Sequence, residues 1–374
     1  SKNLSRLFSD GSTDKSFLPP NYNFGNIAIQ SDGKYVVTHN SNTISATEFS
    51  KISRLNIDGS VDTSFSSAQL SGLYGGFVLS KKILIQNDGK IVIGGLFTGC
   101  NSTSSRDLVR LNTNGLVDTS LQIGSGFAGL LTNDFHWVND IIQQMDGKLI
   151  VSGCFMMFNQ VNRENIIRLN SDGSDDNSFV DLYSFLNFNS IDSISLFNDQ
   201  KILASGSLDY NNKKQGNYIV KINSNGTRDA SFNNIGKGFF RTTVNDVIQS
   251  ADGKILVGGQ FHSYNGLKCN GFTRLNYDGS VDNTLNYGGL NGFEGNNNGE
   301  ITSIETTSDG KIYIGGSFST FNGNPAGRIV RINPDGKKDT SFNIGEGFDY
   351  RTAYPGRIND IMSLPNGYVL VAGF

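Results

Sequence analysis

One twelve-residue phrase occurs seven times in this chain of 374 residues, and this recurrence constrains the fold more than any other feature. Its clearest copy is RLNIDGSVDTSF, from Arg54 to Phe65. The copies begin at Arg6, Arg54, Arg110, Arg168, Lys221, Arg274 and Arg331. A second phrase, such as QNDGKIVIGGLF from Gln86, lies between successive copies of the first. We therefore predict one repeat architecture, not several unrelated domains.

The turn residue of the second phrase gives the period of the repeat. It stands at Asp32, Asp88, Asp146, Asp199, Asp252, Asp309 and Asn366, with separations of 56, 58, 53, 53, 57 and 57 residues. A unit of this length is the size of one β-propeller blade. Only 17% of the residues are charged and 45 are glycine, which is typical of an all-β protein with many tight turns.

Each unit is predicted to contain four short antiparallel strands, here called a, b, c and d. In one unit they cover Val244–Gln249, Lys254–Phe261, Gly271–Asn276 and Ser280–Leu285. With one exception, the a–b and c–d connections contain Asp-Gly or Asn-Gly, pairs that tolerate the positive φ of tight hairpins. Both connections should therefore be tight turns.

The chain begins and ends in the middle of a unit. Strands c and d come first, within residues 4–17, and strands a and b come last, within residues 358–374. We expect residues 1–17 to complete the last blade, because a shared blade would close the ring and remove open sheet edges. The prediction is a single domain over residues 1–374: an all-β, seven-bladed β-propeller with repeats of about 53–58 residues.

The Asp-rich phrase also resembles a calcium loop, an alternative that needs separate treatment. Asn56, Asp58 and Asp62 could imitate ligands, but the first ligand position falls on Arg54. Elsewhere the residue equivalent to Asp58 is Asn, as at Asn114. A hard cation prefers carboxylates, whereas a turn accepts either residue, so we favour turn chemistry over a cation site. No metal and no cofactor is expected.

The combined pattern DGKIVIGGLF followed by RLNIDGSVDTSF resembles the delta-60 repeat family, bacterial repeats classed with the β-propellers and of unknown function. The resemblance covers essentially the whole chain. It implies a propeller of a kind often found in large surface or secreted proteins, and it supplies no catalytic residues. Kelch repeats share the glycine pair after strand b, but their aromatic pair is missing, and the WD dipeptide of WD40 repeats does not occur.

Charge and hydropathy exclude several classes of partner. The net charge is -3 and no cluster of Lys and Arg stands out, so nucleic acid is not an expected partner. The longest apolar runs are strand-sized, so direct membrane insertion is not expected either. Cys100, Cys154 and Cys269 lack disulfide or zinc spacing. A protein or glycan partner remains, for a chain that is extracellular, on a cell surface or on a virion, alone or within a larger assembly.

Strand direction divides the predicted propeller into two faces. The a–b and c–d turns should lie on one face, the turn face, and the b–c and d–a connections on the other, the loop face. The loop connections vary in length and sequence, and variable loops on a rigid scaffold usually carry binding. The candidate anchors are Phe135, His136, Trp137, Phe240, Arg241, Tyr350, Arg351 and Tyr354. Aromatic and Arg side chains are frequent interface anchors and also suit sugar stacking; the alternative for these rings is a place in the blade core.

Three aspartates on strand a are the remaining chemical signal. Asp140, Asp246 and Asp360 each follow an Asn and stand six residues before the a–b turn residue. Strand a is innermost in a propeller, so these carboxylates should line the central channel, as structural hydrogen-bond partners, as ligands of a cation or as an acid/base pair. Three similar copies favour the structural role, and no catalytic residue is assigned. We expect a non-enzymatic interaction or structural module; the alternative is a polysaccharide-active propeller enzyme that uses these carboxylates.

Overall fold

The computed structural model describes most of the chain in twelve segments. They are residues 4–40, 51–72, 78–129, 136–180, 188–208, 219–232, 238–240, 243–285, 292–295, 299–345, 347–348 and 356–373. All regular structure in these segments is β-strand. None of the described residues forms a helix that could cross a membrane.

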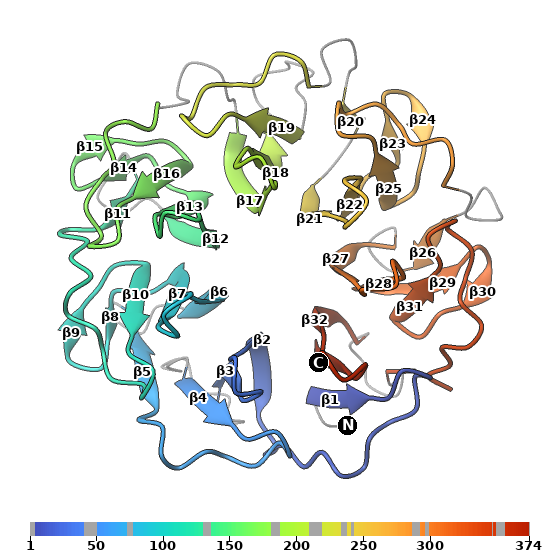
Figure 1. The fold of residues 1–374 in the computed structure, drawn as a ribbon, viewed down its shortest axis with the longest axis horizontal. Helices are drawn as coiled ribbons and strands as arrows, with labels where there is room; N and C mark the ends of the chain where they lie inside the picture. The colour runs from blue at the N-terminus through green and yellow to red at the C-terminus, as the bar shows by residue number, and fades with distance from the viewer. Residues whose placement is uncertain are drawn as a thin grey trace.

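Antiparallel three-stranded units, the central sheets, form the body of the molecule. In chain order they contain β2 (Asn23–Ile29), β3 (Tyr35–Asn40) and β4 (Lys51–Leu55); β6 (Leu79–Ile85), β7 (Ile91–Leu96) and β10 (Leu108–Leu111); β12 (Trp137–Gln143), β13 (Leu149–Cys154) and β16 (Ile166–Leu169); β17 (Phe188–Leu196), β18 (Ile202–Leu208) and β19 (Ile219–Ile222); β21 (Val244–Gln249), β22 (Ile255–Gly259) and β25 (Phe272–Leu275); β27 (Ile301–Thr306), β28 (Ile312–Gly316) and β31 (Ile329–Ile332). Figure 1 shows them arranged around a common centre, each with its first strand innermost. The all-β propeller prediction is confirmed at this level.

Both chain ends contribute to one further central sheet. Strand β1 (Leu4–Leu7) pairs antiparallel with β33 (Val369–Gly373), from Leu4 opposite Ala372 to Leu7 opposite Val369. Strand β33 pairs in turn with β32 (Ile358–Ser363). Figure 1 places this terminal sheet between the sheet of β27 and that of β2. Segments from opposite ends of the sequence therefore lie side by side.

The prediction of a fourth strand in each unit is wrong for the described residues. After the c–d turn the chain makes a single antiparallel bridge, for example Leu275 to Val281, and each of the other units has the same bridge. The next residue, Asp282, then accepts hydrogen bonds from both the backbone N–H and the hydroxyl of Thr284. This side-chain bonding bends the backbone into a turn immediately and so competes with a longer strand. Segment d is a capped turn instead.

Small sheets form in the b–c and d–a connections, which are predicted to be loops. In each, the segment that leads into a unit pairs with the b–c hairpin of the same unit. The strands are β5 (Ala68–Ser71), β8 (Gly99–Cys100) and β9 (Thr103–Ser104); β11 (Phe127–Ala128), β14 (Met157–Phe158) and β15 (Val161–Asn162); β20 (Phe239–Phe240), β23 (Ser263–Tyr264) and β24 (Leu267–Lys268); β26 (Phe293–Gly295), β29 (Phe318–Phe321) and β30 (Asn324–Pro325). Strand β5 also pairs with β4 and joins its small sheet to a central one.

The glycine pair at the end of strand b explains how the sheets pack. A Cβ on Gly94 would lie 2.5 Å from Cγ1 of Val138 in the next central sheet. One on Gly95 would lie 2.0 Å from the carbonyl oxygen of Leu79. The first glycine therefore lets buried side chains of the neighbouring sheet approach, and the second fits beside a register shift in strand a. Between these two sheets the core includes Val92 and Ile141.

The turns of a unit lie together at one end of its strands. Gly33 of an a–b turn packs beside Ile57 of the c–d turn in the same unit, and Gly310 packs likewise beside Pro334. The b–c hairpins pair with the incoming segments at the other end. The predicted separation of turn face and loop face is confirmed.

Candidate functional site

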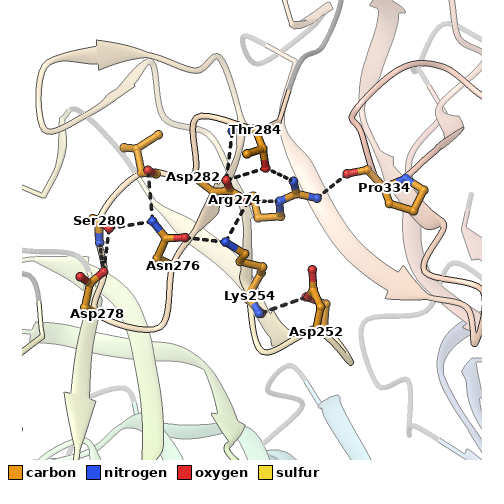
Figure 2. Close-up of polar contacts among 11 residues, drawn as sticks. Asp252, Lys254, Arg274, Asn276, Asp278, Ser280, Asp282, Thr284 and Pro334 are labelled. Atoms are coloured by element: carbon orange, nitrogen blue, oxygen red, sulfur yellow. Dashed lines mark hydrogen bonds and ion pairs between the residues drawn. The ribbon is translucent and has the colours of Figure 1, made fainter.

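The repeated phrase builds a charged cluster at the outer edge of each central sheet, shown for one unit in Figure 2. Arg274 donates from Nε to Oδ2 of Asp282 at 2.7 Å and from Nη2 to the Thr284 hydroxyl at 3.1 Å. Through Nη1 it also donates to the backbone carbonyl of Pro334, in the next unit. The ammonium of Lys254, directly before strand b, lies 3.5 Å from Oδ2 of Asp282. These groups form what we call an outer cluster.

Outer clusters recur around the molecule with the same partners. The strand-c cation and its aspartate are Arg6 and Asp14, Arg54 and Asp62, Arg110 and Asp118, Arg168 and Asp176, Lys221 and Asp229, Arg274 and Asp282, and Arg331 and Asp339. Each cation also donates to a turn carbonyl of another unit, at Ile57, Thr113, Ser171, Ser224, Tyr277, Pro334 and Ser9 respectively. The phrase is therefore a joint between units as well as a turn.

The carboxylates of the outer clusters are fully engaged. Burial alone would raise the pKa of Asp282, but the hydrogen bonds from Thr284 and Arg274 outweigh it and lower the pKa to about 2. The exposed turn residue Asp278 instead accepts hydrogen bonds from the N–H and hydroxyl of Ser280. In the part of the chain that the structure describes, no group of three or more His, Cys, Asp or Glu side chains is arranged to hold a metal ion.

A second set of equivalent positions lies on the innermost strands, and we call it the inner ring. Its members are Asn26, Lys82, Asp140, Ser193, Asp246, Ser303 and Asp360, each six residues before its a–b turn residue. The three predicted channel aspartates accept backbone N–H groups of the next innermost strand: Asp140 from Ile194 at 3.0 Å, Asp246 from Ile304 at 2.7 Å and Asp360 from Ile27 at 3.3 Å. The two serines accept equivalent bonds from Val247 and Ile361.

Lys82 is the one cation of the inner ring. Its ammonium lies 2.9 Å from Oδ1 of Asp140, and this neighbour is the main reason that the pKa of Lys82 is raised. Burial raises the pKa of Asp246 to about 7 and that of Asp360 to about 6. Both pKa values lie nearer neutral pH than that of an ordinary aspartate. The side chain of Lys82 is 40% exposed, so water screens its ion pair with Asp140.

Of the predicted loop-face anchors, the structure describes the side chains of His136 and Trp137. The ammonium of Lys81 lies 4.9 Å from the centroid of Trp137, within cation–π range. The buried indole Nε1 of Trp137 meets no hydrogen-bond acceptor among the described residues. His136 bonds through Nδ1 to the fully buried carboxylate of Asp107, whose pKa burial raises. Lys81 and Trp137 lie near the loop-face ends of the innermost strands β6 and β12, His136 directly precedes β12, and Asp107 directly precedes β10.

Sequence reasoning missed Lys81 and Asp107. Asp107 has a positive φ of 64°, and the equivalent position in the next unit is Asn165, with φ 61°. The left-handed backbone favours Asn, Asp or Gly here, but nothing in the sequence order connects Asp107 with His136. The other anchors, Phe135, Arg241, Tyr350, Arg351 and Tyr354, lie outside the described residues, as does the side chain of Phe240.

A family model described as "Domain of unknown function (DUF5122) beta-propeller" matches the chain six times. The matches cover residues 30–65, 86–121, 144–179, 198–232, 250–285 and 307–342, together more than half of the chain. The predicted resemblance to β-propeller repeats is confirmed in this form, and the name delta-60 is not part of the matched description. No curated protein matches the sequence.

Several solved structures resemble the fold at low sequence identity. A putative oxidoreductase (glucose dehydrogenase) from Thermus thermophilus is 13% identical, with 99% of this chain and 100% of that chain covered and a TM-score of 0.47. The extracellular domain of a putative hybrid two-component system from B. thetaiotaomicron is 12% identical, with 96% and 54% covered and a TM-score of 0.36. The tail fibre of a Staphylococcus aureus phage is 14% identical, with 96% and 71% covered and a TM-score of 0.23. Likeness at this level supports no inference about activity.

Proposed function

The chain belongs to the DUF5122 β-propeller family, and from this premise we propose that it is a closed seven-bladed ring that holds a partner and does not catalyse a reaction. The pairing of β1 with β33 supports a blade shared between the chain ends, completed by residues 1–17. The bond from Arg331 to the carbonyl of Ser9 supports closure from the outer edge. A ring without open sheet edges is a rigid platform for loops.

The observation that carries the binding proposal is the contrast between the two ends of the strands. At the turn end, the repeated Arg, Lys and Asp side chains bond to one another and to neighbouring units. At the loop end, Trp137, His136 and Lys81 belong to no repeated pattern. His136 and Lys81 also contact neighbouring units, through Asp107 and Asn139, but these contacts do not recur from unit to unit as those of the outer clusters do. Unrepeated aromatic and basic groups suit interface anchors. We place the binding surface on the loop face.

The proposed surface includes His136 and Trp137 together with Phe135, Phe240, Arg241, Tyr350, Arg351 and Tyr354. Its partner is a protein or a glycan, met outside the cell, on a cell surface or on a virion, and the propeller serves there alone or as part of a larger assembly. The low net charge and the scattered basic residues give no support to nucleic acid as the partner.

The experiment begins with capture of the partner from the native source by the tagged protein. Trp137→Ala and His136→Ala should then weaken binding, by about 1–3 kcal/mol if the residue is a hot spot. Ser60→Ala and Asp172→Asn change exposed turn residues of the opposite face and serve as matched controls. Loss of binding in these two turn variants, with binding intact in the loop variants, would show that the face is wrong.

The alternative function is a polysaccharide-active enzyme that uses the inner-ring carboxyls. It is favoured by the raised pKa values of Asp246 and Asp360, since general acids often show this property. Asp246→Asn and Asp360→Asn should abolish the release of reducing ends from polysaccharides if this alternative holds. The binding proposal predicts that the unmodified protein releases none.

A further inference from the structure

A cavity of about 780 Å³ opens on the turn face, at the seam between the sheet of β27 and the terminal sheet. Its walls include the a–b turn around Asp309 on one side and Leu364, Pro365 and Gly367 on the other, with Ser9 from the N-terminal turn. Sites for small molecules usually have volumes of about 300–1,000 Å³. This cavity lies on the opposite face from the surface proposed above and is independent of that proposal.

The terminal sheet departs from the repeat at this cavity. In the other units the residue directly before strand b is Lys, and it pairs with the aspartate of its own outer cluster: Lys34, Lys90, Lys148, Lys201, Lys254 and Lys311. The terminal sheet has Tyr368 there instead, and Phe8 where the other phrases have Asn. The two rings lie 5.2 Å apart, and Phe8 is 38% exposed. An aromatic pair thus replaces a polar one.

The turns over this aromatic pair leave space that a side chain of the c–d turn fills in three other units. At Gly33, Gly89 and Gly310 an added Cβ would meet side-chain carbons of Ile57, Thr113 and Pro334 at 3.1 to 3.3 Å. At the equivalent Gly367 nothing lies within 4 Å of that position. The residue equivalent to Pro334 in the terminal sheet is the small Ser9. At Gly147 and Gly253 the nearest atom is a Gln side-chain nitrogen at 3.9 Å, so the aromatic pair of Phe8 and Tyr368, not the open turn alone, distinguishes this unit.

The charged groups of the cavity wall are already paired. Arg331 donates to Asp339, to Ser341, to the Ser9 carbonyl and to the Tyr313 hydroxyl. Lys311 lies 3.1 Å from Asp339. A phosphate or sulfate group would need uncommitted cations, and a metal ion would need clustered carboxylates, a grouping not found among the residues that the structure describes. An anionic ligand and a metal ion are therefore disfavoured.

We propose that this seam cavity binds a neutral saccharide. A sugar ring presents a C–H face that packs on an aromatic ring and an edge of hydroxyls that both donate and accept hydrogen bonds. Tyr368 supplies the ring, held in place by Phe8 and by the Arg6 guanidinium 5.0 Å from its centroid. Asp309, whose side chain is 61% exposed, and Ser308 belong to the other wall of the cavity and supply polar partners there. A ring fixed by its neighbours lowers the entropic cost of binding.

The test uses the whole protein, fluorescently labelled, on an array of neutral oligomers of glucose, galactose, mannose and N-acetylglucosamine beside sialylated and sulfated glycans. The strongest neutral glycan is then titrated by calorimetry. Tyr368→Lys, which restores the lysine of the other units, should lose affinity by about tenfold or more. Tyr368→Phe keeps the ring and should retain binding, and both variants should keep the wild-type melting temperature within a few degrees.

Three outcomes would overturn the proposal. They are the absence of binding to any neutral glycan, binding restricted to the charged glycans, and neutral-glycan binding that Tyr368→Lys leaves unchanged. Trp137→Ala alters only the loop face. Loss of partner binding in Trp137→Ala therefore tests the proposed function, and loss of glycan binding in Tyr368→Lys tests the seam cavity separately.

Discussion

The outer clusters and the inner ring do the same mechanical work with different chemistry. Both join neighbouring units through hydrogen bonds to the backbone of the next unit. In the outer clusters the residues are almost constant, since a long cation must bond to its own aspartate and also reach a carbonyl across the joint. At five of its seven positions the inner ring needs only an acceptor for a nearby N–H, so aspartate and serine serve equally. The residue type at a position varies less between units when its side chain must make more contacts.

The outer clusters and the inner ring shift the pKa values of their aspartates in opposite directions. In the outer clusters, hydrogen bonds and paired cations hold the aspartate pKa values low, for example at about 2 for Asp229 and Asp282 despite burial. On the innermost strands, Asp246 and Asp360 have fewer compensating partners, so burial raises their pKa values. The same residue type therefore stabilises the fold in different pH ranges at the two places.

Removal of residues 1–17 should lower the stability of the fold more than any other change considered for the outer clusters and the inner ring. The deletion takes away β1 and the outer cluster of Arg6 and Asp14 but leaves every residue of the inner ring in place. If outer joints and strand pairing hold the ring shut, the melting temperature should fall by about 10 °C or more. Differential scanning calorimetry measures it. An unchanged melting temperature would mean that the chain ends do not close the ring.

Removal of one charge from a single outer cluster should have the next largest effect. Asp282→Asn leaves the buried Arg274 without its ionic partner, and a broken buried pair typically costs about 3 kcal/mol of unfolding free energy. Urea denaturation gives the value. Asp278→Asn, four residues earlier in the exposed turn, is the matched control and should cost far less, because Asn occupies this position at Asn114 and Asn225. Equal losses in the two variants would remove the distinction between joint and turn.

The pH dependence of stability should distinguish the contribution of the outer clusters from that of the inner ring without any deletion. An unfolded Asp titrates near pH 4, so between about pH 4 and 7 the folded protein binds more protons at Asp246 and Asp360 than the unfolded chain does. Their contribution to unfolding free energy therefore falls as the pH rises through this range. The outer aspartates have lowered pKa values, so their contribution is present above about pH 4 and is lost as the pH falls further.

Urea denaturation between about pH 3 and 8 should show greatest stability in mildly acidic solution. Asp246→Asn should flatten the neutral side of the profile and leave the acidic side unchanged. A wild-type profile that rises steadily toward pH 8, or a variant profile identical to it, would contradict the assignment of the raised pKa to Asp246.

Replacement of Lys82 should have the smallest effect. Lys82→Met breaks the pair with Asp140, but Asp140 keeps its hydrogen bonds from Ile141 and Ile194, and the lysine is 40% exposed. We expect a loss of about 1 kcal/mol or less in unfolding free energy. Lys82→Arg, which keeps the charge, is the control. A loss as large as that of Asp282→Asn would mean that the inner ring depends on its ion pair.

The sequence predicted the repeat, its turns and the two faces because each depends on local chemistry. Asp-Gly and Asn-Gly pairs specify tight turns wherever they occur. The missing fourth strand was harder to foresee, since strand and turn are both local and the side chain of Asp282 decides between them. The small loop-face sheets had a visible signal in the Asn265-Gly266 and Asn322-Gly323 pairs, whose positive φ values suit two-residue hairpins.

Contacts between units could not be predicted from order in the chain. Lys82 and Asp140 meet because innermost strands of neighbouring units lie together, and the residues are far apart in sequence. His136 and Asp107 likewise belong to different units. The seam cavity depends on Tyr368 lying beside Phe8 from the opposite end of the chain. Such pairs follow from packing geometry and not from a local pattern.

Hydrogen–deuterium exchange of the protein with and without its captured partner tests the central claim, loop-face binding, most directly. The account predicts slower exchange at the start of β12, next to Trp137, and in the b–c hairpins of β14 and β15 and of β23 and β24. Slower exchange confined to the turn-face peptides, such as the c–d turn around Asp278, would contradict it.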